Sequence, residues 1–206
     1  MVPSGSANLA PLSAMILILV ESPNKARAVA QYAREVFDEK VVVRSTLGHL
    51  RDLPDGELGV NILQGFAPEY VIRNKKAVSY LRPFVRDANQ VFLAMDPDRE
   101  GEAIAWHVTK VFAAELRRKS VLRVSFNAIT REAVQAGLRQ GGAIDMALMK
   151  AAIARRVIDR LIGYKISPRL WAHVDGKDLS AGRVQTAALR ILAGQSEERW
   201  DVDVEL

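Results

Sequence analysis

Cysteine is absent from the 206-residue sequence. Its absence excludes disulfide bonds, cysteine-based zinc sites and thiol nucleophiles, and it fits a reducing compartment. Long apolar runs are missing as well. The longest, residues 14–20, is too short to span a bilayer, and no Lys or Arg precedes it as in a signal peptide. We therefore expect a cytoplasmic protein with no membrane partner.

Net charge is small but unevenly distributed along the chain. The whole sequence carries +5, whereas residues 150–190 contain nine Lys and Arg against three Asp, a net charge of +6 for that stretch. A local excess of this kind is typical of proteins that bind a polyanion, although a solvated helix face can also be basic. We favour nucleic acid as the partner.

Strand-like and helix-like patterns alternate over residues 15–142. Strands are expected at residues 15–20, 40–45, 91–95 and 121–126, and helices at residues 23–36, 78–87, 100–114 and 130–139. This alternation predicts an α/β domain with a mostly parallel sheet flanked by helices. Residues 1–14, rich in Ser, Ala, Pro and Gly, are expected to be a disordered extension.

Gln140-Gly141-Gly142 marks the expected end of the first domain. Residues 143–206 are predicted to form a second, mainly helical domain, with helices at residues 145–162 and 183–193. The final residues, 200–206, alternate apolar and acidic side chains as a half-buried strand does. Because a strand needs a partner, we expect this second domain to be incomplete.

Carboxylates follow two of the predicted strands. Asp96, Asp98 and Glu100 come directly after the strand at residues 91–95, and Glu21 follows the strand at residues 15–20. Because parallel strands open at their carboxyl ends onto one crevice, these four acids could converge. Their hard oxygens suit Mg²⁺, and one of them could handle a proton. The alternative is a solvated acidic turn in which Asp98 or Glu100 stabilises a helix N-terminus.

Lys25 lies near the start of the helix that follows Glu21. Ser22 can cap this helix and Pro23 can occupy its first turn. A helix N-terminus attracts anions, so Lys25 could reach a phosphate there. An ordinary surface lysine is the alternative.

The helix at residues 145–162 carries a ridge of charge. Arg155 and Asp159 are four residues apart, as are Arg156 and Arg160, and the opposite side of the helix is apolar. Such a ridge suits phosphates and base edges, although surface ion pairs would show the same spacing. Tyr164 could stack on a base, whereas core packing is the more common fate of a lone aromatic side chain.

A run of small residues precedes the last predicted helix. Ser180-Ala181-Gly182 leaves backbone N–H groups free at the start of this helix, with Arg183 and Gln185 adjacent. This arrangement is typical of phosphate binding, and a simple N-cap would look similar.

Six motifs, taken together and in this order, resemble the N-terminal part of type IA DNA topoisomerases. They are Val-Glu-Ser-Pro-Asn-Lys-Ala (20–26), Gly-His-Leu-Arg-Asp-Leu-Pro (48–54), Asp-Pro-Asp-Arg-Glu-Gly-Glu-Ala-Ile-Ala-Trp-His (96–107), Phe-Asn-Ala-Ile-Thr (126–130), Ala-Arg-Arg-Val-Ile-Asp-Arg-Leu-Ile-Gly-Tyr (154–164) and Leu-Ser-Ala-Gly-Arg-Val-Gln (179–185). The resemblance extends from Met15 onward. It implies a Toprim fold, which is Rossmann-like, over residues 15–142, and a single-stranded-DNA-binding segment over residues 143–206.

The resemblance also implies roles for individual residues. Asp96, Asp98 and Glu100 match acids that hold Mg²⁺, Glu21 matches a glutamate at the scissile phosphate and Lys25 a lysine that assists there. The residues that match a groove for single-stranded DNA are Arg155, Arg156, Asp159, Arg160, Tyr164, Ser180, Arg183 and Gln185. The implied reaction is relaxation of negatively supercoiled DNA without ATP or another nucleotide, through a reversible phosphotyrosyl link.

The sequence departs from the family pattern in one important respect. Its four tyrosines, at positions 32, 70, 80 and 164, all precede the last motif, and none has the context of the family nucleophile. The glycine that usually precedes Leu179 is Asp178 here. We therefore expect a chain that binds Mg²⁺ and single-stranded DNA but is inactive alone. A free-standing Toprim nuclease, a primase-like enzyme and a non-enzymatic DNA-binding protein are the alternatives.

Overall fold

The computed structural model describes residues 14–173, 175 and 179–196. The chain divides into two compact units. Within the described residues, the first unit comprises residues 14–52 and 70–152, and the second comprises residues 53–69 together with the described residues from 153 onward. Residues 1–13 of the extension expected at residues 1–14, Asp178 and the strand expected at residues 200–206 lie outside the described residues.

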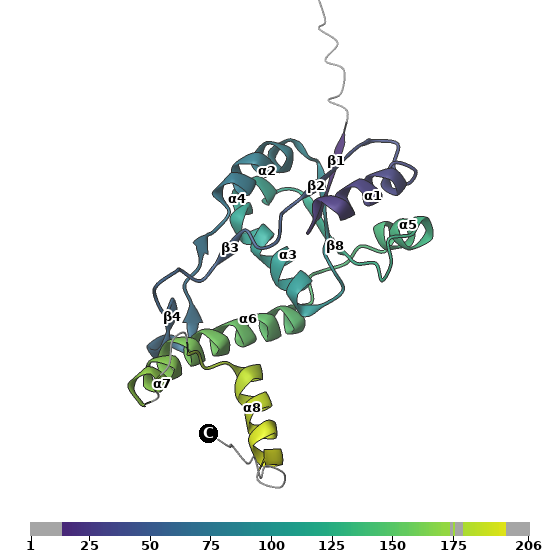
Figure 1. Cartoon of the computed structure of the whole chain (residues 1–206). Coiled ribbons are helices and arrows are strands. Elements are labelled where there is room, and N and C mark those ends of the chain that lie inside the picture. Colours follow the sequence, from purple (N-terminus) through teal and green to yellow (C-terminus); the bar gives the residue numbers. More distant parts are fainter. Residues whose placement is uncertain (1–13, 174, 176–178, 197–206) are drawn as a thin grey trace, which may run out of the picture. The chain divides into compact units, whose positions relative to one another are not determined.

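A four-stranded parallel sheet forms the centre of the first unit (Figure 1). Its order is β2-β1-β7-β8, formed by β1 (Met15–Val20), β2 (Lys40–Ser45), β7 (Gln90–Ala94) and β8 (Ser120–Val124). The register aligns Leu17 with Val42 on one side and with Val91 on the other. This confirms the predicted α/β class and the parallel sheet.

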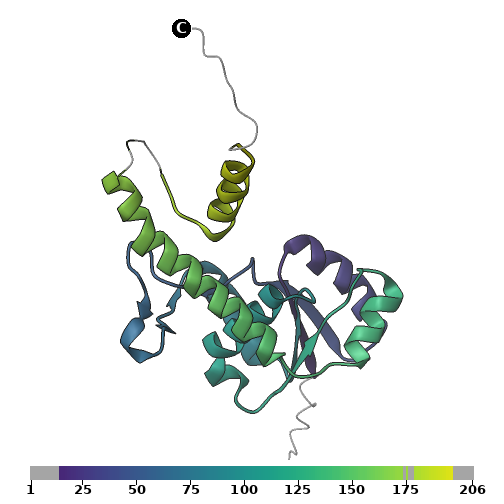
Figure 2. The same cartoon turned by 90° about the horizontal axis from the view of Figure 1, so that it is seen from below.

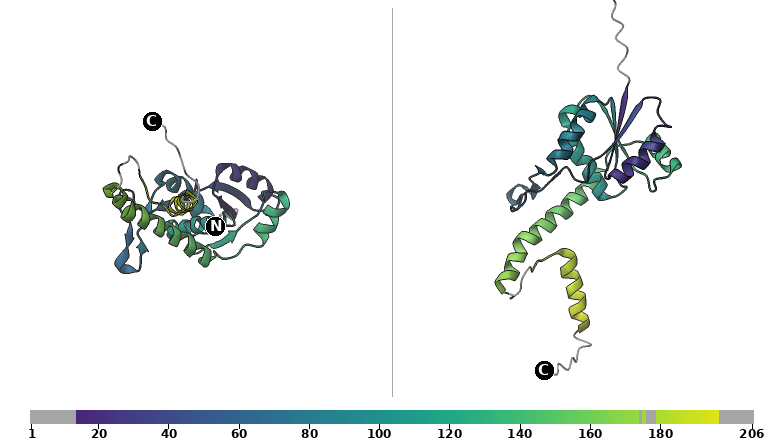
Figure 3. Two further views of the ribbon diagram at one scale, coloured as in Figure 1. Left: turned by 60° about the horizontal axis from the view of Figure 1, so that its bottom comes forward. Right: turned by 45° about the horizontal axis from the view of Figure 1, so that its top comes forward.

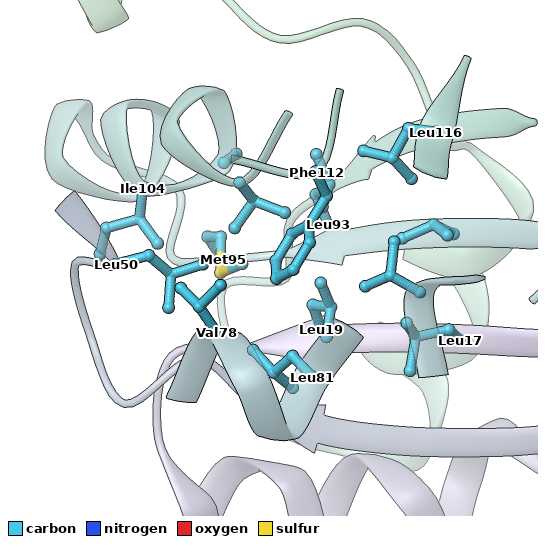
Figure 4. Packing of buried hydrophobic residues seen from close by; sticks show 14 of the residues in the cluster. Leu17, Leu19, Leu50, Val78, Leu81, Leu93, Met95, Ile104, Phe112 and Leu116 are labelled. Atoms are coloured by element: carbon cyan, nitrogen blue, oxygen red, sulfur yellow. The ribbon is translucent and has the colours of Figure 1, made fainter. Parts of the chain in front are cut away.

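Side chains alternate between the two faces of the sheet and build a core on each. Leu17, Leu19 and Leu93 point to one face, against α2 (Lys75–Asp87), α3 (Arg99–Val111) and α4 (Ala113–Leu116) (Figure 4). Ile18 and Phe92 point to the other face, against α1 (Pro23–Ala33) and α5 (Arg131–Arg139). Figure 2 shows α1 and α5 together on one side of the sheet. Burial of both faces explains why the two central strands, β1 and β7, are almost continuous apolar runs.

Four helices begin at a residue whose side chain caps them. Ser22, Asn74, Asp98 and Thr130 each accept a hydrogen bond from a backbone N–H of the first turn, at α1, α2, α3 and α5. The first helix is shorter than expected, because it ends at Ala33 and not near Val36.

Short strands and a long helical segment make up the rest of the chain. β3 (Arg51–Asp52) pairs antiparallel with β6 (Val71–Ile72) in the first unit. In the second unit, β4 (Val60–Asn61) pairs with β5 (Ala67–Pro68) around the 3₁₀ turn η1 (Ile62–Gln64). Helix α6 (Met146–Leu161) begins in the first unit and ends in the second. The domain boundary expected after Gly142 stays a prediction. The boundary between the two compact units lies between Ala152 and Ile153, within α6.

Helix α6 ends at Leu161, within one residue of the predicted end at 162, but helical structure continues beyond it. A π-helical turn, η2 (Ile162–Ile166), follows Leu161, and α7 (Ser167–His173) continues from it. Pro168 does not end the helical structure, because it is the second residue of α7, where a missing N–H costs little. The last described helix is α8 (Arg183–Ser196), drawn in yellow in Figure 3. Among the described residues, no helix has the length and apolar character needed to cross a bilayer.

Candidate functional site

The order of the strands places a topological switch point between β1 and β7. The chain leaves β1 through α1 on one face of the sheet, and it reaches β7 through α2 on the other face. Diverging connections of this kind open a crevice at the carboxyl ends of the two strands, where α/β proteins bind their ligands. Glu21 follows β1 directly, and Asp96 lies two residues beyond the end of β7.

Glu21, Lys25 and Asp96 meet at this switch point. The backbone N–H of Asp96 donates to Oε1 of Glu21 at 2.9 Å. Nζ of Lys25, from the first turn of α1, contacts Oδ1 of Asp96 and lies 3.9 Å from Oε2 of Glu21. One ammonium therefore lies against two carboxylates that are separated by 75 positions in the sequence. The structure brings together three of the predicted site residues.

Asp98 has a structural role in addition to its predicted one. Its Oδ1 accepts the backbone N–H of Gly101 at 2.7 Å, which caps α3. Gly101 is required at this point, because a Cβ there would lie 2.2 Å from the backbone oxygen of Asp96. The absence of a side chain lets α3 start immediately beside the end of β7. The helix-capping alternative noted for this acidic turn is therefore present in the structure, for Asp98.

Glu100 is paired with a histidine that we did not assign to the site. Nε2 of His49 lies 2.5 Å from Oε1 of Glu100, and the glutamate side chain is 61% exposed. His49 follows Gly48 in the loop after β2, so it is contributed by a third segment. The motif Gly-His-Leu-Arg indicated that this loop has a functional role. Nothing in its spacing predicted that His49 would contact Glu100.

A buried ion pair, which we did not predict, contacts the backbone of the acidic turn. Nε of Arg123 on β8 donates to Oε1 of Glu102 on α3 at 2.9 Å, and both side chains are less than 10% exposed. The guanidinium also donates to the backbone oxygens of Met95, at 2.8 Å, and Asp96, at 2.6 Å. Oε2 of Glu102 accepts the backbone N–H of Asp145 at 3.0 Å. The one signal in the sequence was a charged residue inside an otherwise apolar strand.

A second unpredicted cluster surrounds Arg51 of β3. Its Nε donates to Nδ1 of His107 at 2.6 Å, and its guanidinium lies 4.7 Å from the ring centres of both Tyr70 and Trp106. Burial, and then the neighbouring Arg51 cation, lower the pKa of His107 to about 3. The histidine is consequently a neutral acceptor at physiological pH. Burial also lowers the pKa of Arg51.

The donors at the crevice match Mg²⁺ in kind. Mg²⁺ takes oxygen ligands, retains several waters and is often bound through only one or two carboxylates. Among the described residues, however, no three Asp, Glu or His side chains come close enough to hold a metal ion. In the structure Lys25 neutralises Asp96, and His49 contacts Glu100. The predicted ligands Glu21, Asp96, Asp98 and Glu100 stay a prediction.

Asp159 organises two arginines in the second unit. Its carboxylate accepts from Nε of Arg183 at 2.5 Å and from Nη2 of the same residue at 3.2 Å. Nε of Arg155, one turn earlier on α6, lies 3.8 Å from Oδ2. The hydrogen bond from Arg183 lowers the pKa of Asp159, and Arg155 and Arg156 add to this effect. The expected ridge is thus assembled from α6 and the start of α8.

Arg160 and Tyr164 face a loop of the same unit. Nη1 of Arg160 donates to the backbone oxygens of Pro54, at 2.7 Å, and Glu57, at 2.8 Å, and to the hydroxyl of Tyr164 at 3.2 Å. The guanidinium lies 5.0 Å from the ring centre of Tyr164. In the structure Arg160 therefore anchors the loop at residues 54–57, a role that the sequence did not indicate.

The turn before α8 is held by α7. The backbone N–H of Ala181 donates to Oγ of Ser167 at 3.0 Å, and Nε1 of Trp171 donates to the backbone oxygen of Leu179 at 2.6 Å. Oγ of Ser180 lies 3.4 Å from Oε1 of Gln185. α8 begins at Arg183, directly after the small residues, as predicted. The N–H of Ala181, expected to be free, is instead bonded to Ser167, and the role of Ser180, Arg183 and Gln185 stays a prediction.

Comparisons with known proteins match both parts of the chain. The family described as Toprim domain matches residues 16–129, and the family described as DNA topoisomerase matches residues 143–204. The structure of full-length topoisomerase I from Thermotoga maritima is similar, with 36% identity and a TM-score of 0.75 over 88% of this chain. The chain spans 30% of the length of that enzyme. A pilus assembly-related protein from Burkholderia pseudomallei K96243 aligns at 12% identity, over 71% of this chain and 91% of that one, with a TM-score of 0.29.

Proposed function

Because the chain belongs to the type IA DNA topoisomerases, whose N-terminal part it matches, we propose that it provides the Mg²⁺-binding and single-stranded-DNA-binding elements of such an enzyme. The whole reaction would relax negatively supercoiled DNA by cleavage, strand passage and religation, without ATP. Its location would be the cytoplasm. The observation that carries this proposal is the meeting of Glu21, Lys25 and Asp96 at the switch point of the sheet.

Lys25 would bind the scissile phosphate. Its side chain is 30% exposed and starts from the first turn of α1, where backbone N–H groups and the helix dipole also favour an anion. Glu21 is held by the backbone of Asp96, so its carboxylate can accept or return a proton at a fixed position beside that phosphate.

Asp96 and Asp98, with Glu21 and Glu100, would hold the metal. When bound, Mg²⁺ would offset charge that develops on the phosphate oxygens. Arg123 donates to the backbone oxygens of residues 95 and 96, which would help to keep the Asp96 carboxylate oriented.

The second unit would guide the DNA strand. Arg155, Arg156 and Arg183 supply positive charge, and Asp159 fixes the position of two of these guanidinium groups. Arg160 and Tyr164 offer a guanidinium and a ring for phosphates and bases, and Ser180 and Gln185 lie at the N-terminus of α8. Sequence tolerance is expected, because backbone contacts and stacking do not read base edges.

None of the four tyrosines is expected to be the nucleophile. In the first unit, Tyr70 packs on the His107 ring at 4.7 Å, Tyr80 packs on Phe84 at 5.4 Å, and Tyr32 packs against the core beneath α1. In the second unit, Tyr164 contacts Arg160. The 206-residue chain should therefore bind DNA without forming a covalent link to it.

A plasmid assay tests this proposal. The chain is incubated with negatively supercoiled plasmid and Mg²⁺, without ATP, and the products are resolved on a gel. We expect the plasmid to stay supercoiled and intact while a single-stranded oligonucleotide is bound. Topoisomers would reveal a nucleophile within the chain. Nicked circles without a covalent adduct would favour the alternative, a Toprim nuclease.

A further inference from the structure

Leu47 has two unusual properties in one residue. Its φ angle is +57°, in the left-handed region, and its side chain is 57% exposed. Leucine rarely adopts this conformation, which glycine and asparagine adopt at much lower cost. Exposure means that packing within the chain does not compensate. Strained backbone that persists in this way is often found at functional sites.

The turn that contains Leu47 is fixed by hydrogen bonds to the end of β1. Oγ of Ser45 donates to the backbone oxygen of Glu21 at 2.8 Å, and the N–H of Gly48 donates to the same oxygen at 3.2 Å. The N–H of Leu47 itself donates to Oγ of Ser45 at 3.0 Å. These bonds join backbone groups and the Ser45 hydroxyl, so none of them uses the side chain of residue 47.

The two residues that follow Leu47 both contact residues of the site. The N–H of Gly48 donates to the backbone oxygen of Glu21, and Nε2 of His49 lies 2.5 Å from Oε1 of Glu100. Leu47 is therefore an exposed apolar side chain in the turn that carries His49 to Glu100. Its exposed fraction shows that the chain itself leaves more than half of this isobutyl group uncovered.

We propose that Leu47 packs against the base of the nucleotide next to the phosphate bound at Lys25. This inference rests on the proposed function, which brings an unpaired DNA strand across the crevice. Each nucleotide of that strand carries an unstacked base whose apolar face is open to water. A leucine held by a fixed turn can cover this face. The contact would hold one nucleotide in place without reading its hydrogen-bonding edge.

The test is a scan of abasic sites in a labelled single-stranded oligonucleotide of about 12 nucleotides. Binding to the 206-residue chain is measured by fluorescence anisotropy, with the abasic site moved through each position. For the unchanged chain we expect one internal position at which loss of the base weakens binding about fivefold. In Leu47→Asn that sensitivity should disappear, so that intact and abasic strands bind equally there. Asparagine tolerates the left-handed conformation, so the turn is retained.

Two further variants separate a base contact from other effects. Leu47→Met keeps an apolar side chain and should retain the abasic sensitivity. Leu63→Gly removes a leucine that is 97% exposed and controls for a general loss of apolar surface. The urea midpoint of Leu47→Asn should equal or exceed that of the unchanged chain, because asparagine relieves strain. A purely structural role would lower the midpoint and leave the abasic sensitivity unchanged.

The outcomes distinguish this inference from the function on which it rests. Normal strand binding with the same abasic sensitivity in Leu47→Asn, or with none at any position of the unchanged chain, would overturn the role of Leu47 alone. No single-strand binding by the unchanged chain would overturn the proposed function, and the Leu47 contact with it.

Discussion

His107 shows how one buried residue links stability to pH. It is 4% exposed and accepts a hydrogen bond from Arg51, and its pKa in the folded chain is lowered to about 3 from 6.5. The unfolded chain therefore binds more protons than the folded chain between these two values. Its stabilising contribution is full above about pH 6.5 and is lost as the pH falls towards 3. At pH 5 we expect a loss of about 2 kcal/mol relative to pH 7.

Urea unfolding of the unchanged chain and of His107→Asn at several pH values checks this expectation. Asparagine can present an oxygen where Nδ1 accepts from Arg51, but it does not titrate. The variant should show a smaller loss of unfolding free energy between pH 7 and pH 5. An identical pH dependence in the two chains would show that other groups cause it.

At the scale of elements, Asp159 connects α6 with the start of α8. It pairs with Arg183 and lies near Arg155, although it is an acid in a segment proposed to bind a polyanion. Simple electrostatics would predict that Asp159→Ala, which raises the net charge by one, improves DNA binding. We expect the reverse, a two- to fivefold (about 1 kcal/mol or less) weaker affinity, because the arginines lose the partner that orders them.

Anisotropy with a single-stranded oligonucleotide measures this effect. Glu69→Ala is the matched control, because it removes an exposed acid of the same unit. Its affinity should be unchanged or slightly higher. Tighter binding by Asp159→Ala would show that Asp159 only repels DNA.

Local patterns predicted the elements well, and they failed where distant segments decide the structure. The ends of β1 and β7 could be read from the sequence because apolar runs stop at Glu21 and Asp96. The Arg123–Glu102 pair could not, because its residues lie 21 positions apart on β8 and α3. The π turn after α6 also escaped prediction, because no periodic pattern in the sequence marks it.

At the scale of the whole molecule, the sequence suggested two successive segments, whereas the compact units are interleaved. Residues 53–69 belong with the second unit, although they lie between two parts of the first. Long-range contacts such as those of Arg160 with the loop at residues 54–57 account for this assignment. No local pattern carries that information.

Single-strand binding as a function of salt tests the central claim most directly. The 206-residue chain is titrated with labelled single-stranded and duplex oligonucleotides of one sequence, in Mg²⁺, at several salt concentrations. We predict tighter binding to the single strand, with the logarithm of the association constant falling against that of the salt concentration with a slope of about −2, as for three neutralised phosphates. Absence of single-strand binding, or equal affinity for the duplex, would contradict the account.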